Sequence, residues 1–475
     1  MDDLRGKKSI FDLSLLPTVF ALAGPAMLEM AVDTAVQYID TAMVGALGTE
    51  ATAAVGSTST VNWLVGGTVM AFGVGFLSYI AQHLGAGEKE KARQAAAQSV
   101  LAALTLGVLF TAVTLLLSRR VPVWMQADEA IRDTAARYFF IVYLPMLFRT
   151  ARMIFGMVLR AAGDTKTPMR VGVGVNLLNV VLNFLLIYEP RSLVLFGRSV
   201  FVWGAGWGVI GAAAASAVSY TVGGGLLTLL FFRHPVISPR GCSLKPDKTV
   251  LLPCLRVSFP NMLQRFGTSL GYVAFAAMIN ALGPVSAAAH IIANTVESAF
   301  YIPGFGMMQA AATLTGNAIG ARDLPRQKKL ARTILLLETV LMFVSGALLF
   351  VLAPPLVRLF SKDAAVIALG VTVLRMVACS EPVFGVSIAL EGMLQGAGKT
   401  KMPFIINMIG MWGVRILGTW ICTVPLGLGL EAAWGCMIGH NILLCLLFAI
   451  YYLRGNWNPL CEKQVNKGEA CHESL

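Results

Sequence analysis

Charged residues are scarce in this chain of 475 residues. Asp, Glu, Lys and Arg together make up 13% of the sequence, whereas a soluble domain carries roughly 25%. Hydrophobic residues make up 56%, the mean hydropathy is +0.72, and runs such as Val209–Phe232 contain no charge at all. A run of about 20 apolar residues is long enough to cross the hydrocarbon core of a bilayer. The composition therefore excludes a soluble protein and indicates a polytopic integral membrane protein.

The sequence also lacks the short motifs of many enzymes and of ATP-driven pumps. It has no H-E-x-x-H motif, and its eight cysteines show no C-x-x-C or C…H spacing for a metal. Gly163–Thr167 (Gly-Asp-Thr-Lys-Thr) is similar to a phosphate loop in composition only, because the Walker spacing and the preceding strand are missing. We therefore expect that the protein is not an enzyme, that ATP does not drive it and that it holds no cofactor.

Twelve segments are apolar and long enough to cross a membrane as helices. They cover approximately residues 16–44, 52–83, 94–118, 132–159, 168–188, 203–232, 251–282, 286–318, 330–354, 364–394, 403–424 and 430–453. The sequence therefore predicts an all-α membrane protein with twelve transmembrane helices.

Basic residues are distributed unevenly between the connections on the two sides of the membrane. With the N-terminus placed in the cytoplasm, the cytoplasmic segments contain 21 Lys and Arg residues and the external connections contain six. An excess of Lys and Arg marks the cytoplasmic side. We therefore expect both termini in the cytoplasm and attribute the net charge of +12 to membrane topology. A nucleic-acid partner is not expected.

One fixed offset, which we call the repeat offset, aligns separate blocks of the sequence with one another. The blocks begin at Leu47, Gly85 and Leu159 in the first half, and the same offset places them on Leu282, Gly320 and Leu394 in the second half. In the longest block, residues 159–168 and 394–403, six of ten residues are identical. Each half contains six expected spans, so both halves have the same orientation. Parallel repeats of this kind are typical of transporters, in which the substrate path runs between the two halves.

The repeat also predicts the domain organisation. We expect an N-lobe of six helices at residues 1–232, a cytoplasmic linker at 233–250, a C-lobe of six helices at 251–453 and a cytoplasmic tail at 454–475. The linker contains three prolines and four basic residues, a composition that is unfavourable for a continuous helix. The two bundles are expected to be related by a pseudo-two-fold axis normal to the membrane.

Several stretches resemble one family of transporters along nearly the whole chain. They are Ile39–Gly48, the pair Gly163–Pro168 and Gly398–Pro403, Ala287–Ile292, Pro303–Gly306 and Gly320–Ala321. Together they resemble the multidrug and toxic compound extrusion (MATE) family, and among its members the DinF-like branch. The resemblance implies a V-shaped pair of six-helix bundles that exports organic cations and other amphipathic compounds in exchange for Na⁺ or H⁺. It also implies a monomer in the plasma (inner) membrane of a bacterium.

Acidic residues follow one face of the first expected helix. Glu29, Asp33 and Asp40 lie within about 40° of one another when successive residues turn by 100°, and Gln37 lies beside them. A charged group at membrane depth is costly, so each one suggests a functional role. The alternative is a structural role for Glu29 and Asp33, paired with buried arginines such as Arg149 or Arg152.

Amide side chains follow one face of the fifth expected helix. Asn176, Asn179 and Asn183 stand at i, i+3 and i+7. Their oxygens suit Na⁺, and they can equally hydrogen-bond a carboxyl group; helix packing is the alternative. By resemblance, Asn179 matches an Asn of the family's N-lobe cation site, and Ser216 stands where the family often has a Thr ligand. Asn183, however, stands where many DinF-like members have a second Asp.

These observations define the candidate site residues. We expect coupling to a cation or proton at Asp40, Asn179, Asn183, Asp33, Glu29 and Ser216. If the cation is Na⁺, we expect the first three to coordinate it. Candidate substrate-binding residues are Gln37, Asn176, Glu297 and Glu381. For Glu297 and Glu381 an intramembrane salt bridge is the alternative.

The expected function is therefore secondary antiport, in which amphipathic and often cationic drugs leave the cell in exchange for H⁺ or Na⁺. A flippase for lipids or lipid-linked oligosaccharides is the alternative from the same superfamily. Such a protein needs a strongly cationic cavity, and the arginines within the spans leave this alternative open.

Overall fold

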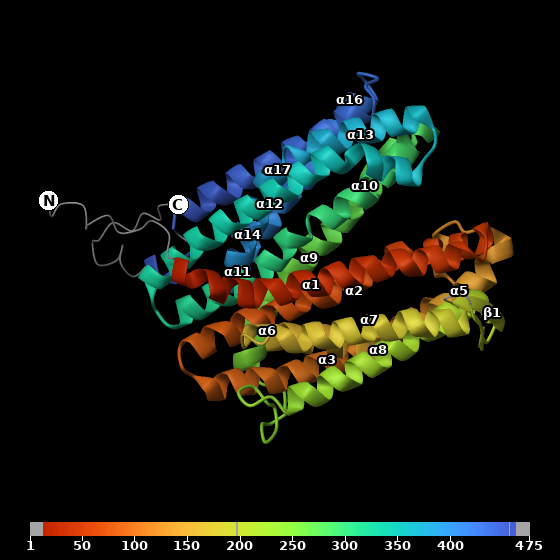
Figure 1. Ribbon diagram of the computed structural model, residues 1–475. Helices are drawn as coiled ribbons and strands as arrows, with labels where there is room; N and C mark the ends of the chain where they lie inside the picture. The colour runs from red at the N-terminus through yellow and green to blue at the C-terminus, as the bar shows by residue number, and fades with distance from the viewer. Residues whose placement is uncertain (1–12, 196–197, 456, 462–475) are drawn as a thin grey trace. The chain divides into compact units, whose positions relative to one another are not determined.

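The computed structural model describes residues 13–195, 198–455 and 457–461, and most of them lie in helices (Figure 1). The helices of the first half are α1 (Leu16–Gly45), α2 (Thr49–Gly85), α3 (Lys89–Leu117), α4 (Val121–Trp124), α5 (Glu129–Tyr143), α6 (Met146–Ala161), α7 (Lys166–Leu186) and α8 (Gly208–Phe232). A 3₁₀ turn, η1 (Leu13–Leu15), precedes α1.

The second half contains the remaining helices. They are α9 (Lys248–Asn280), α10 (Pro284–Phe300), α11 (Ile302–Gly320), α12 (Leu324–Phe360), α13 (Ala364–Ala378), α14 (Glu381–Gly396), α15 (Lys401–Met408), α16 (Leu417–Thr423) and α17 (Leu430–Leu453). A π-helical segment, η2 (Ile409–Ile416), joins α15 to α16 without a break.

The helices account for all twelve expected spans. By length and hydropathy, eight helical segments of the described chain can cross a membrane, and the bent pairs α5–α6 and α13–α14 bring the number to ten. The other two expected spans correspond to α9 and to α10 with α11. Both carry buried polar side chains, including Gln264 on α9 and Glu297 on α10. The prediction of an all-α membrane protein is confirmed.

Proline residues mark the bends within spans. The axis turns by 50° between α5 and α6 and by 52° between α13 and α14. Pro145 precedes α6 and Pro382 lies in the first turn of α14. Proline has no N–H to donate to the preceding turn, so a helix readily starts at proline but does not continue smoothly through it.

The sixth expected span is shorter than predicted, because α8 begins at Gly208 and not at residue 203.

A short hairpin fills the connection between α7 and α8. Strands β1 (Arg191–Leu195) and β2 (Arg198–Val202) are antiparallel, with Arg191 opposite Val202 and Leu195 opposite Arg198. The guanidinium of Arg191 lies 4.0 and 4.3 Å from the ring centres of Tyr188 and Phe184. These cation–π contacts fix the start of the hairpin to the end of α7.

The chain forms two compact units. Unit 1 comprises residues 1–27, 77–88 and 256–475, and unit 2 comprises residues 28–76 and 89–255. Helices α1, α2 and α9 each contribute residues to both units. The lobes expected from the sequence, 1–232 and 251–453, remain a prediction, and the units are described separately below.

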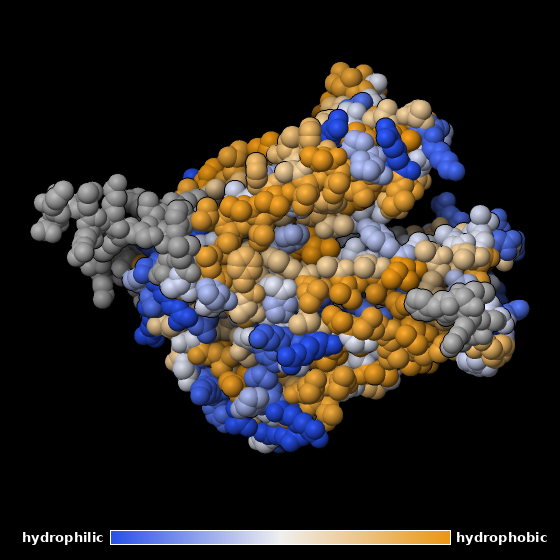
Figure 2. Space-filling model, in the orientation of Figure 1, coloured by the Kyte–Doolittle hydropathy of each residue, from blue (hydrophilic) through white to orange (hydrophobic). Residues whose placement is uncertain are grey.

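Unit 1 contains two clusters of buried apolar side chains. One joins the start of α1 to α11, α12, α14 and α17 and includes Val19, Met307 and Phe448. The other joins α9, α10, α12, α13 and α17 around Phe275 and Trp434. Large apolar side chains also face outward, as Phe343 does with 66% of its surface exposed. Apolar side chains cover most of the visible helix flanks, and hydrophilic side chains gather near helix ends and connections (Figure 2).

Unit 2 is built from helices that approach one another closely. Helix α6 packs against α3 and α8, and α8 also packs against α5 and α7. Gly224 of α8 lies against the main chain of Phe148, where a Cβ atom would overlap the carbonyl group. Small residues allow this approach, which favours helix association in a membrane.

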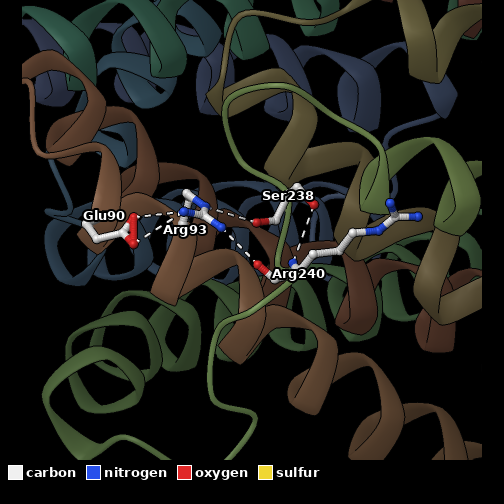
Figure 3. Close-up of polar contacts among 4 residues, drawn as sticks. All are labelled: Glu90, Arg93, Ser238 and Arg240. Atoms are coloured by element: carbon white, nitrogen blue, oxygen red, sulfur yellow. Dashed lines mark hydrogen bonds and ion pairs between the residues drawn. The ribbon is translucent and has the colours of Figure 1, made fainter.

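The connection between α8 and α9 lies against α3 within unit 2. Arg93 donates from Nη2 to the carbonyl of Arg240 at 2.8 Å and from Nε to the carbonyl of Ser238 at 3.3 Å, while Glu90 accepts from Nη1 at 3.1 Å (Figure 3). Further along α3, Gln98 donates to the carbonyl of Lys245 at 2.8 Å. The basic linker is therefore fastened to α3 by side-chain contacts with its main chain.

Candidate functional site

The three acids of α1 all meet polar side chains within unit 2. Helix α1 presents Glu29, Asp33 and Asp40 to α6 and α7, whose polar residues recur with helical spacing. The sequence placed the three acids on one face, and the structure shows partners for each of them on these two neighbouring helices. We call Glu29, Asp33 and Asp40, together with their partners on α6 and α7, the ladder, and each acid with its partners a rung. The partners differ in chemistry from one acid to the next, and this difference bears on function.

Asp40 lies among neutral hydrogen-bonding groups. Asn183 Nδ2 donates to Asp40 Oδ1 at 2.6 Å. The Asn179 amide lies 3.0 and 3.1 Å from the two carboxylate oxygens when its nitrogen faces Asp40. This orientation is favoured because two oxygens facing each other would both be acceptors. Asn179 also lies 3.4 Å from Ser216 Oγ. One carboxylate, two amides and one hydroxyl thus come together in unit 2.

Glu29 forms a buried ion pair. Arg160 Nη2 donates to Glu29 Oε2 at 2.6 Å, and about a tenth of each side chain is exposed. Gly172 leaves room for Glu29, because a Cβ atom there would lie 2.9 Å from Glu29 Oε1. From the sequence, the structural alternative for Glu29 was pairing with a buried arginine such as Arg149 or Arg152. A buried arginine is indeed the partner, but it is Arg160 and neither of these two. Arg160 lies at the end of α6, where it was counted with the basic residues of the connection.

Asp33 forms the middle rung of the ladder. It accepts a hydrogen bond from Asn176 Nδ2 on α7. Gln37, the fourth polar residue expected on this face, has an exposed side chain. The candidate substrate ligands Asn176 and Gln37 are therefore in different environments, since Asn176 is held by an acid and Gln37 is exposed.

A second polar network in unit 2 escaped the sequence analysis. Arg149 Nη1 donates to Asn62 Oδ1 at 2.6 Å, and the hydroxyl of Tyr143 lies 3.2 Å from the same oxygen. The guanidinium of Arg149 also lies 5.0 Å from the centre of the Tyr220 ring. Tyr220 stands one helical turn after Ser216 on α8, and this spacing is the one signal that could have suggested its position.

The acidic residues of unit 1 differ from those of the ladder. Glu297 on α10 is 7% exposed, and Glu381, the first residue of α14, is 1% exposed. Neither forms an ion pair within 4.0 Å among the described residues. Both carboxylate oxygens of Glu381 also lack a hydrogen-bond partner in the described part of the chain. The salt bridges considered from the sequence are therefore not formed at these two positions.

Glu338 is a buried acid that the sequence analysis missed. It is fully buried in the middle of α12, and neither carboxylate oxygen has a hydrogen-bond partner among residues 13–195, 198–455 and 457–461. Two glycines border it, since a Cβ atom at Gly385 or Gly304 would lie 2.8 or 3.0 Å from Oε1. As the one charge in the run Ile334–Leu352, Glu338 could have been singled out from the sequence.

Unit 1 also holds a buried arginine among aromatic rings. Arg415, in the π-helical segment η2, lies 4.3 and 4.8 Å from the ring centres of Phe275 and Tyr272. His290 packs edge-on against Phe275 at 5.5 Å. A π-helical turn inside a helix is often found at functional sites, and here it carries the arginine into the protein interior.

Comparison with known proteins identifies the family. The sequence model of the MatE family matches residues 25–185 and 260–421. The chain belongs to the MatE family. The two matches begin at residues 25 and 260, which the repeat offset places on one another. The family expected from the sequence is therefore confirmed.

Relatives and solved structures agree with this assignment. The chain is 30% identical over 436 residues to the probable multidrug resistance protein NorM of Thermotoga maritima, covering 92% of each chain. It is 24% identical to the probable multidrug resistance protein YoeA of Bacillus subtilis, covering 90% of this chain and 91% of YoeA. A MOP superfamily transporter from Pyrococcus furiosus superposes with a TM-score of 0.85 at 23% identity, over 93% of this chain and 96% of that chain. The structural likeness shows the MATE fold.

The side chains of this MatE chain suit monovalent cations or protons better than a transition metal. No group of three or more His, Cys, Asp or Glu that could hold a metal ion occurs within the described ranges. Both amides turn their nitrogens toward the carboxylate of Asp40, so the oxygens available in this arrangement are those of Asp40 itself, which are hard ligands. The same carboxylate can bind a proton instead, with the amides as hydrogen-bond partners. Because these partners of Asp40 carry no positive charge, its carboxylate can take up one small cation.

Proposed function

We propose that this MatE protein is a secondary antiporter that exports amphipathic, often cationic, organic compounds in exchange for H⁺ or Na⁺. The observation that carries the proposal is the environment of Asp40. Its neighbours in unit 2 are the neutral side chains of Asn179, Asn183 and Ser216. The names of the relatives as multidrug resistance proteins support the substrate class.

The charge of Glu29 is already neutralised within the protein, whereas that of Asp40 is not. Glu29 has a guanidinium at 2.6 Å, so its charge is balanced inside the protein. Asp40 has two amide neighbours, which stabilise a carboxylate without cancelling its charge. An uncompensated charge within a membrane span is costly, so Asp40 favours a bound proton or Na⁺. That bound cation is the natural exchange partner for a cationic substrate.

Antiport follows if cation and substrate prefer different conformations. A ligand shifts a conformational equilibrium only by the difference in its affinity for the two states. Occupation of Asp40 by a cation would favour one state, and its release would favour the other. The ion and the drug then move in opposite directions through one alternating-access cycle. We place this cycle in a plasma membrane, with a monomeric protein and both termini in the cytoplasm.

The ladder supports either coupling ion. For Na⁺, the carboxylate of Asp40 and the hydroxyl of Ser216 are suitable ligands, and Asn179 and Asn183 would have to turn their amide oxygens toward the ion. For H⁺, Asp40 is the acceptor, and Asp33 with its Asn176 partner is a second carboxyl group on the same face. We propose Asp40 as the coupling residue in both cases, with Asp33 and Glu29 in supporting roles. Glu297 and Glu381 remain candidate substrate ligands.

Efflux from ATP-free proteoliposomes tests the proposal. A fluorescent cationic dye should leave the vesicles when an H⁺ or Na⁺ gradient is imposed separately, and the gradient that drives efflux identifies the ion. Efflux that requires ATP and ignores both gradients would refute the proposal. Vesicles without protein and vesicles without a gradient are the controls.

The flippase alternative receives less support from the molecule. Arg149 is occupied by Asn62, and Arg160 by Glu29. Two of the arginines within unit 2 are therefore already engaged, and they do not provide a free cationic surface for a diphosphate. A labelled lipid headgroup that changes leaflet in the same vesicles would revive this alternative.

A further inference from the structure

Two cysteine side chains of unit 1 face each other between α16 and α17. Cys422 Sγ and Cys436 Sγ lie 3.7 Å apart, close enough for either thiol to donate to the other. Both cysteines are free thiols, and both are partly exposed. The two helices that carry them pack against each other within the same unit. We call Cys422 and Cys436 the thiol pair.

A glycine allows the two helices to approach closely at the thiol pair. Gly418 lies one helical turn before Cys422, so the two residues share one face of α16. A Cβ atom at Gly418 would lie 3.2 Å from Sγ and 3.6 Å from Cβ of Cys436. Disulfides join cysteines whose Cβ atoms are about 3.5–4.5 Å apart, and the two sulfur atoms here need to approach by less than about 2 Å to bond. The face of α16 that carries Cys422 therefore lies within reach of a disulfide to α17.

Both cysteines lie near the connection between the last two expected spans. Cys422 is the penultimate residue of α16, and Cys436 lies in the second turn of α17, about 10 Å from the start of that helix. With the N-terminus in the cytoplasm, this connection is external. Residues 424–429, which form it, contain no charge, whereas the cytoplasmic connections are basic. Disulfides form and persist in oxidising compartments outside the cytoplasm, so the thiol pair lies at the end of unit 1 where oxidation is favoured.

We propose that the thiol pair forms a reversible disulfide between α16 and α17 when a small disulfide oxidant reaches it from the external side. The side rests on the topology that is part of the proposed function, with both termini in the cytoplasm. The bond itself rests on the contact between the two sulfur atoms, and it does not depend on which compound the protein exports. The thiol pair is thus a site of redox modification between the last two spans.

Thiol–disulfide exchange forms the bond in two steps. The thiolate of Cys422, which is nearer the end of its helix, attacks one sulfur of the oxidant, so that a mixed disulfide forms and one thiol of the oxidant leaves. The thiolate of Cys436 then attacks the sulfur of Cys422, and the second thiol of the oxidant leaves. The two cysteines lose two electrons and two protons, which the disulfide of the oxidant takes up as it becomes two thiols. A small dithiol reverses both steps.

The disulfide joins α17 beside a residue that contacts the buried arginine of unit 1. Met437 follows Cys436 directly, and its Sδ atom lies 3.0 Å from Arg415 Nη2. Arg415 itself lies about two turns before Cys422 in the same span. A cross-link closes a loop of the chain, which restricts the unfolded state and so stabilises the folded one. Oxidation should therefore stabilise the part of unit 1 that carries Arg415.

Mass spectrometry of the full-length protein tests the bond and its side of the membrane. Right-side-out and inside-out vesicles are reduced, freed of reductant and treated with oxidised glutathione, which does not cross the membrane, before free thiols are blocked with a maleimide. Chymotrypsin cleaves after Trp434, between the two cysteines, so a pair of linked peptides that separates on reduction reports the disulfide. We expect it in right-side-out vesicles and two blocked thiols in inside-out vesicles. A disulfide that forms in neither orientation, or equally in both, would overturn the proposal.

Thermal unfolding of the purified protein tests the bond independently of the topology. Oxidised glutathione should raise the Tm of the wild-type protein by about 3–6 °C, the shift expected when a loop of about 15 residues is closed in a chain of this length. Reduction should reverse the shift. Cys422→Ser and Cys436→Ser should abolish it, whereas Cys445→Ser, which removes another partly exposed cysteine of α17, should keep it. A shift that persists in Cys422→Ser would overturn the proposal. A disulfide that forms in inside-out vesicles alone would uphold the bond and refute the proposed topology.

Discussion

The two repeats have different polar side chains at corresponding positions of their helices. In the first repeat, Glu29 of α1 forms an ion pair with Arg160 of α6. The repeat offset places Gln264 and Gln395 at the same two positions in the second repeat. There Gln264 and Gln395 both donate to Glu391, at 2.8 and 3.0 Å. Corresponding positions therefore hold a charged pair in one repeat and, in the other, two glutamines that both donate to a third residue, Glu391.

The difference is larger further along the ladder. Asp33 and Asp40 correspond to Thr268 and Phe275, and Asn176, Asn179 and Asn183 correspond to Met411, Val414 and Gly418. The second repeat thus lacks the ladder. Its buried acids, Glu297, Glu338 and Glu381, stand on other helices. The repeat preserves backbone register and close packing, whereas the polar side chains have diverged.

The largest expected effect tests whether the ladder alone carries coupling. Asp40→Asn keeps the shape of the side chain and removes its charge, so the residue can no longer exchange a cation. Gradient-driven dye efflux should fall to the level of vesicles without protein, while membrane expression stays normal. Wild-type efflux and ion dependence in this variant would move the coupling site to Glu297, Glu381 or Glu391.

The second prediction concerns the ion pair, whose two residues are replaced by those of the second repeat. Glu29→Gln leaves Arg160 without its carboxylate partner, so the free energy of unfolding should fall by roughly 3–5 kcal/mol. The double variant Glu29→Gln, Arg160→Gln copies the residues of the second repeat and should recover most of this loss. Thermal unfolding in detergent, followed by intrinsic fluorescence, measures both. Equal losses in the single and double variants would show that the ion pair contributes little.

A smaller effect is expected at the middle rung. Asp33→Asn retains a hydrogen-bonding group opposite Asn176, so efflux should fall by about fivefold, which corresponds to the lower end, about 1 kcal/mol, of typical coupling free energies. Initial efflux rates measured over a range of pH, beside those of Asp40→Asn, check the order of the two effects. A loss as complete as that of Asp40→Asn would place both acids in the coupling site.

The smallest effect should come from the corresponding region of the second repeat. In Glu391→Gln the charge that accepts from Gln264, Gln395 and Asn407 is lost. We expect a loss of about 1–3 kcal/mol in the free energy of unfolding, the typical size for hydrogen bonds to a charged group. Ion dependence of efflux should not change. An altered ion dependence would indicate that the second repeat takes part in coupling.

Features that depend on local order along the chain followed from the sequence. The twelve apolar runs became helices, because each is long enough to cross a bilayer and satisfies its own backbone groups. The repeat could be detected because glycine and proline residues recur at the same offset in both halves. The common face of Glu29, Asp33 and Asp40 follows from helical geometry. These features need no knowledge of which helices become neighbours.

Tertiary structure alone decided which side chains meet. Glu29 and Arg160 are 131 residues apart, and their pairing depends on the rotation and depth of two helices that the sequence does not specify. The same applies to Asn62 with Arg149, and to the hydrogen bonds that Ser78 and Gln82 donate to the carbonyl of Gly396. Helical periodicity determines the face on which a residue lies, but only packing of the whole chain determines what that face contacts.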